Sequence, residues 1–193
     1  MQHDSTSHQI AQRLFLFVSS LWVGSLITVG YLVAPTLFAT LTDRQVAGMV
    51  AGAIFQVEAY VSLVLCVALL VLANLLVSRG LQAYRAIRWI LLAMLVCAAL
   101  GSFVLMPWME NLREDALLQG MPVMYSPSAS LFATLHGISS SVFLVQSLLG
   151  LYLVWRLTQS RFFGLAKRVL RRFGLLLLAT AAFLKPTREP SLR

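Results

Sequence analysis

Two short methionine motifs are the first candidates for chemistry in this sequence. Met106 and Met109 frame one M-P-x-M motif, Met121 and Met124 frame a second, and His136 follows twelve residues after Met124. Thioether sulfur is a soft ligand that suits Cu(I), and an imidazole can complete such a site. The spacing therefore indicates a copper(I) site built from these five residues. The alternative is that the methionines are apolar packing residues, which is their commoner use.

A carboxylate and an imidazole also fall at one predicted depth. Glu58 lies 21 residues before Arg79 and His136 lies 20 residues before Arg156, which at helical rise places both about 30 Å from a basic flank. Pro35 and the first methionine pair fall at a similar height. Ionisable groups near a span are costly and usually face the bundle or water. Glu58 and His136 therefore either share a proton in the bundle or each meet water at the outer boundary.

The composition requires that these residues sit on membrane helices. Of the 193 residues, 59% are hydrophobic and 11% are charged, and the mean hydropathy is +0.82. This excludes a soluble enzyme, a disordered chain and a disulfide scaffold. The sequence has apolar runs that are long enough to cross the hydrocarbon layer as helices. They lack the alternation of polar and apolar residues that barrel strands need, so they predict an all-α membrane protein. The four expected spans cover about residues 14–34, 56–78, 89–109 and 131–155.

The basic residues predict the orientation of these spans. Thirteen of the 15 are Arg13 beside the N-terminal segment 1–12, three arginines in the second connection, and Arg156 with the eight basic residues of the tail 157–193. Because Lys and Arg mark the cytoplasmic side, both termini are expected in the cytoplasm of a bacterial inner membrane. Split among juxtamembrane segments, the net charge of +8 fits anionic lipid and not nucleic acid.

The tail carries its own helical pattern. Lys167, Arg168, Arg171 and Arg172 share one face of a helix, and apolar residues between Phe162 and Leu177 share the other. This predicts a basic amphipathic helix on the inner leaflet. The run 175–184 is too short to span, and residues 186–193 are expected to be disordered.

Small residues indicate where the helices should approach closely. Gly48 and Gly52 have GxxxG spacing, Ser20 and Gly24 lie four apart, and Gly137 precedes three serines. Without a hydrophobic drive in lipid, such residues favour helix contacts. Cys66 and Cys97 lie inside spans and are interpreted as small buried hydrophobic residues.

Several elements together resemble the transmembrane protein 205-like family of small four-helix membrane proteins. They are Trp22-Val-Gly24, Ala34-Pro-Thr-Leu-Phe38, Ala47-Gly48 with Phe55, and Leu135-His136-Gly137 with Ser139. The resemblance covers about residues 12–156 and implies the fold and the membrane location. It carries neither an enzyme activity nor an established ligand. Gln146 stands in the region where the family often has Asn.

Three functions are compatible with these observations. The first is a structural or partner-binding membrane protein, in contact with the bilayer and with a homo-oligomer or membrane partner. The alternative is transport or soft-metal tolerance that uses the outward Met, His and Glu layer. A membrane enzyme or haem protein is disfavoured because haem ligation in a bundle needs a second facing histidine. No phosphate loop, zinc-protease motif or nucleophile elbow occurs in the sequence. We therefore expect no catalytic residue and no cofactor other than copper(I) in the alternative case.

Overall fold

The computed structural model describes residues 2–183, with side chains for residues 9–159, and the described residues form helices and no strand. Four helical stretches are long and apolar enough to cross a membrane: Gln9–Thr40, Arg44–Ser78, Tyr84–Leu118 and Ala129–Gln159. The predicted all-α class with four membrane-crossing helices is confirmed. In order, the elements are α1 Gln2–Thr28, η1 Val29–Val33, α2 Ala34–Thr40, α3 Arg44–Ser78, α4 Tyr84–Leu100, η2 Gly101–Leu105, α5 Met106–Leu118, η3 Val123–Tyr125 and α6 Ala129–Phe183.

The chain divides into two compact units, Met1–Arg156 and Leu157–Arg193. The helix bundle belongs to the first unit. In the second, the chain is helical as far as Phe183, which agrees with the helix expected there. Its predicted basic and apolar faces, and the disorder predicted for residues 186–193, lie outside the described residues.

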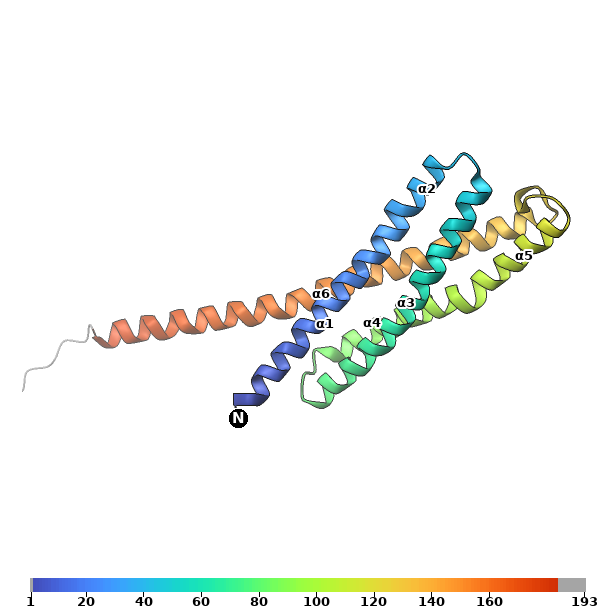
Figure 1. The fold of residues 1–193 in the computed structure, drawn as a ribbon. Helices are drawn as coiled ribbons and strands as arrows, with labels where there is room; N and C mark the ends of the chain where they lie inside the picture. The colour runs from blue at the N-terminus through green and yellow to red at the C-terminus, as the bar shows by residue number, and fades with distance from the viewer. Residues whose placement is uncertain (1, 184–193) are drawn as a thin grey trace, which may run out of the picture. The chain divides into compact units, whose positions relative to one another are not determined.

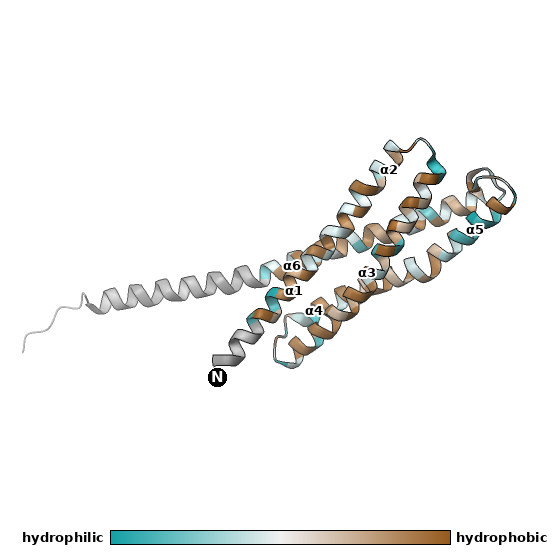
Figure 2. Cartoon of the chain, in the orientation of Figure 1, coloured by the Kyte–Doolittle hydropathy of each residue, from teal (hydrophilic) through white to brown (hydrophobic). Residues whose placement is uncertain are grey.

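The helices of the first unit form a bundle with apolar flanks. The pair α3 and α4 runs antiparallel (Figure 1), and the Arg88 side chain donates a hydrogen bond of 2.8 Å to Asn74. The carboxylate of Asp43 caps α3 by accepting from the backbone N–H groups of Gln45 and Val46. Hydrophobic residues cover the middle of the helices, whereas hydrophilic residues gather on α5 and at the α2–α3 connection (Figure 2). This distribution is that of a multi-pass membrane protein.

Two helices continue past prolines that lie close to their predicted ends. Pro35 lies in α2 and Pro107 in α5, each at the start of an α-helical segment directly after a π-helical turn. Proline lacks an N–H group, and its ring crowds the carbonyl four residues earlier. The wider π turn relieves that conflict without breaking the helix. The first and third helices therefore extend to Thr40 and Leu118, beyond the predicted ends at residues 34 and 109.

The close helix contacts are not where the glycine motifs placed them. A methyl group added at Gly24, Gly48 or Gly137 would meet nothing within 4 Å, and at Gly52 it would make only ordinary contacts. The prediction of close approach at these positions is wrong. The tight positions are Gly30, against the ring of Phe143 in α6, and Gly150, whose added methyl would lie 2.9 Å from Val23. Single glycines that face a side chain of the neighbouring helix thus bring η1 and α1 close to α6. The spacing of glycines could not predict this, because which glycine faces a neighbour depends on how each helix is rotated.

Gly30→Ala is expected to lower the free energy of unfolding by about 1–3 kcal/mol, as overpacking does. The new methyl would overlap the Phe143 ring, which packs edge-on against Phe55 with ring centroids 5.0 Å apart. Gly24→Ala in the same helix is the control and should be neutral or stabilising. Thermal unfolding of both variants in one detergent measures the difference. Equal melting temperatures would contradict the contact.

Candidate functional site

Glu58 is a buried carboxylate inside the membrane-crossing helix Arg44–Ser78. It lies on α3, and only 7% of its surface is exposed. The Ser25 hydroxyl on α1 lies 3.0 Å from Glu58 Oε1 and 2.8 Å from the carbonyl oxygen of Trp22. A hydroxyl has one proton to donate, so the two acceptors share it. Glu58 is thus buried against α1 with a single, partly engaged donor.

One turn further along α3, a second polar contact joins three helices. The indole Nε1–H of Trp22 donates to Ser62 Oγ at 2.9 Å, and the Gln146 side-chain amide on α6 donates to the same oxygen at 3.2 Å. All three residues are at most 5% exposed. The Ser62 hydroxyl oxygen accepts two hydrogen bonds and so satisfies two buried donors.

Sequence reasoning missed most of this polar core. The residues share helix faces, since Ser19, Trp22 and Ser25 are spaced by three on α1 and Glu58 and Ser62 by four on α3. That spacing was the available signal. Gln146, which stands in the region where the resembled family often has Asn, lies inside the core and donates a hydrogen bond there.

Two further hydroxyls are buried in the first unit without a hydrogen-bond partner in the described residues. They belong to Ser19 on α1, which is fully buried, and to Ser102 in η2, which is 4% exposed. A buried, unsatisfied hydroxyl costs about 1–3 kcal/mol. Such groups mark places where water or a ligand atom would be stabilising.

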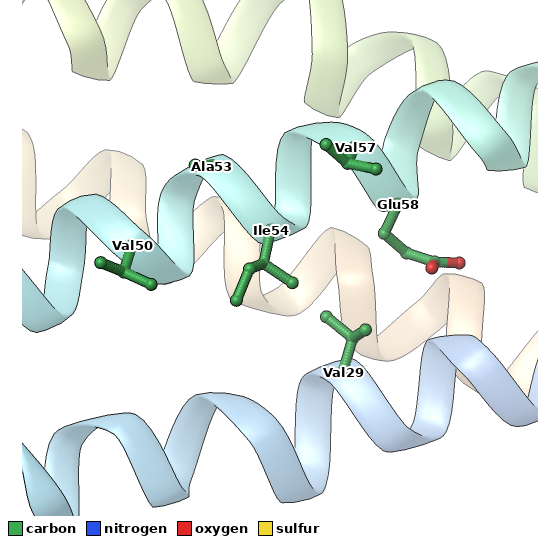
Figure 3. A pocket seen from close by; sticks show the side chains of 6 residues that line it. All are labelled: Val29, Val50, Ala53, Ile54, Val57 and Glu58. Carbon is green, nitrogen blue, oxygen red and sulfur yellow. The ribbon is translucent and has the colours of Figure 1, made fainter.

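An apolar groove ends at Glu58. It has a volume of about 440 Å³ and is lined by Val29 of η1 and by Val50, Ala53, Ile54, Val57 and Glu58 of α3. Figure 3 shows Val29 facing the row of α3 side chains, with the Glu58 carboxylate at one end of that row. The groove is open to the outside, because Val57 is 63% exposed.

His136 does not join this site. Its side chain is exposed, while its neighbour Leu135 is 3% exposed and packs inward. One residue along a helix turns the side chain by about 100°, so α6 presents Leu135 to the bundle and His136 away from it. The structure therefore does not bring Glu58 and His136 together, and Ser25 is the hydrogen-bond partner of Glu58. Pro35 is likewise exposed, within α2.

The methionines have ordinary packing roles or are exposed. Met109 belongs to a buried apolar cluster with Leu105 and Leu135, and Met106 packs against it. Met124 is 59% exposed on η3, and Met121 is half-buried in the preceding connection. The copper(I) interpretation finds no support here. Among the described residues, no three His, Cys, Asp or Glu side chains are grouped so as to hold a metal ion.

A family model places the chain among known sequences. The model for DUF4149, a domain of unknown function, matches residues 17–117. The chain belongs to the DUF4149 family. No curated protein and no solved structure matches it. The DUF4149 region contains Ser25, Glu58 and every residue that lines the groove, whereas Gln146 and His136 lie outside it. All the residues that line the groove therefore lie within the part of this chain that the family model matches.

Proposed function

We propose that this DUF4149 protein is a partner-binding membrane protein and that the groove ending at Glu58 is its binding site. The observation that carries the proposal is a buried carboxylate at the end of an apolar groove that is open on one side. Ionisable residues within membrane helices are expensive and mark functional sites. Binding pockets in proteins are mostly apolar, with a few placed polar groups.

The energetics of Glu58 support a bound partner. Burying a charged or polar group without compensation is costly, and the cost falls when a donor or an opposite charge is supplied. Within the described residues, Ser25 is the group that bonds the carboxylate, and it divides its proton with the Trp22 carbonyl. A partner that brings a donor to Glu58 would recover part of that cost.

Photo-crosslinking in native membranes tests the proposal. A diazirine amino acid is placed at Val57 on the groove, or at Val64 on the same helix outside the groove. The two positions are 63% and 68% exposed, so they sample lipid equally well. We expect a discrete adduct at Val57 that is absent at Val64 and weakened by Glu58→Gln. The same diffuse labelling at both positions would overturn the proposal.

Transport is a second candidate, favoured by the buried hydroxyls of Ser19 and Ser102 that lack a partner. Together with Ser25 and Ser62 they supply polar groups inside an otherwise apolar bundle. Proton influx into proteoliposomes, reported by a pH-sensitive dye and abolished by Glu58→Gln, would favour transport over binding. Copper is not proposed as the cargo, because Met106 and Met109 pack in the apolar cluster.

The remaining features of the proposal rest on charge and on motif resemblance. We place the protein in a bacterial inner membrane with both termini in the cytoplasm, and its basic tail on anionic lipid. The motifs that resemble the transmembrane protein 205-like family support the same small membrane-protein class. The proposal includes association with a second copy or with another membrane protein. It includes neither an enzyme activity nor a cofactor.

The orientation predicts which connection reacts from outside the cell. In a background with both native cysteines replaced by alanine, Gln119→Cys should react with a membrane-impermeant maleimide on intact spheroplasts. Gln82→Cys in the α3–α4 connection should react only after lysis, because Arg79, Arg85 and Arg88 hold that connection in the cytoplasm. Both glutamines are exposed, so access to the side chain itself does not bias the result. The reverse labelling pattern would invert the topology.

A further inference from the structure

The chemistry of the groove narrows the kind of partner, if the groove is the binding site proposed above. Glu58 is the charged residue among the six that line it, and the other five are Val, Ile or Ala. An apolar wall with one carboxyl group at its end is complementary to a molecule with an apolar body and one polar head. The groove has a volume of about 440 Å³ and is open on one side, so it would enclose only part of such a molecule.

The acceptor capacity of Glu58 favours a cationic head. An ionised carboxylate offers two oxygens with about four lone-pair positions. Ser25 occupies one position, and within the described residues no Lys, Arg or His forms an ion pair with Glu58. A protonated amine carries several N–H donors and the opposite charge. Charge-assisted hydrogen bonds are roughly twice as strong as neutral ones.

The depth of Glu58 favours a free amphiphile that enters from the bilayer. Glu58 lies fourteen residues into α3, about 21 Å from the Arg44 end of that helix at helical rise. Because Glu58 lies near the outer end of the expected span 56–78, an amphiphile at the outer boundary of the bilayer can reach it, and the exposed Val57 leaves that side of the groove open. The π turn η1 supplies Val29 to the opposite wall, and such turns are frequent at functional sites.

We propose that the groove binds a lipid-phase amphiphile with a protonated amine, whose ammonium group lies on Glu58 and whose apolar body lies along Val29, Ile54 and Val57. The site recognises charge at one end and a narrow apolar chain along its length. Binding involves no covalent step. This inference rests on the groove being a binding site. The experiment therefore distinguishes a groove that binds nothing from a groove that binds a ligand of another class.

The test uses the full chain in phosphatidylcholine nanodiscs, with tritiated dodecylamine as the probe and empty discs as the background. Excess dodecylamine should displace the bound probe, and dodecanol of the same chain length should not. Glu58→Gln should weaken binding by about ten- to a hundredfold, as expected for a lost hydrogen bond to a charged group. Glu110→Gln removes the same charge from an exposed position outside the groove and should leave binding unchanged.

A second variant covers the case in which Glu58→Gln fails to fold. Ile54→Trp fills the groove, keeps the carboxylate and should also lose the probe, while size-exclusion chromatography verifies that each variant remains monodisperse. Equal competition by dodecanol, or unchanged binding by Glu58→Gln and Ile54→Trp, would overturn the amine assignment. If Val57 crosslinking depends on Glu58 while the amine fails, the groove still binds and only its ligand class is wrong. A Val57 adduct the size of a second protein chain would also overturn the small-amphiphile assignment.

Discussion

Met109→Ala is expected to lower the free energy of unfolding by about 2–5 kcal/mol, the range for truncating a buried methionine. Met109 is 7% exposed and packs with Leu105 and Leu135, so its side chain joins α5 to η2 and to α6. Alanine would leave a cavity that these neighbours cannot fill. Unfolding followed by circular dichroism in a mixed-micelle denaturant series measures the loss.

Met124→Ala is the matched control, because Met124 is 59% exposed and belongs to the other M-P-x-M motif. We expect a change within about 0.5 kcal/mol, as for other surface substitutions. Comparing Met109→Ala with Met124→Ala distinguishes packing from metal binding. A copper(I) site would use both M-P-x-M motifs, so both substitutions would weaken it. Cu(I) titration against a competing chelator should show no affinity that either variant removes. Tight binding lost equally in both variants would restore the metal interpretation.

Ser62→Ala is the second substitution with a large expected effect, a destabilisation of about 2–6 kcal/mol, because each of two orphaned donors costs about 1–3 kcal/mol. Ser62 Oγ accepts from both Trp22 and Gln146, so one missing oxygen leaves two buried donors without an acceptor. The bundle interior offers them little water. The same denaturant series measures the change.

The control for Ser62→Ala is Ser141→Ala on α6. The Ser141 hydroxyl donates to the Gly137 carbonyl of its own helix, and the residue is exposed. Its loss should therefore be nearly neutral. A double-mutant cycle with Trp22→Phe then isolates the Trp22–Ser62 bond, for which we expect a coupling of about 0.5–2 kcal/mol. Zero coupling would mean that this bond does not hold α1 to α3.

The fold class was predictable because the deciding properties are local in sequence. Charge-free apolar runs can only be helices or barrel strands in lipid, and their lack of alternation left helices. Glu58 was also predictable as a candidate, since a carboxylate within such a run is costly wherever the helix packs. The asymmetric placement of basic residues is equally local, and the predicted topology rests on it.

The helix ends and the glycine contacts required the structure. The spans predicted to end at residues 34 and 109, close to Pro35 and Pro107, continue because a π turn precedes each proline. Gly48 and Gly52 have a contact spacing, yet Gly30 and Gly150 make the tight contacts. Spacing specifies a face of a helix, but not which neighbour that face meets.

The sequence by itself determined that this chain has four helices long and apolar enough to cross a membrane, and it singled out Glu58 as a carboxylate within one of them. Only the tertiary structure decided that Glu58 meets Ser25 and an apolar groove while His136 points away, and that Met109 is a core residue. The physical reason is that hydropathy and periodicity are properties of one segment. Hydrogen bonds and grooves depend on the rotation and order of several helices, which residues far apart in the sequence decide together.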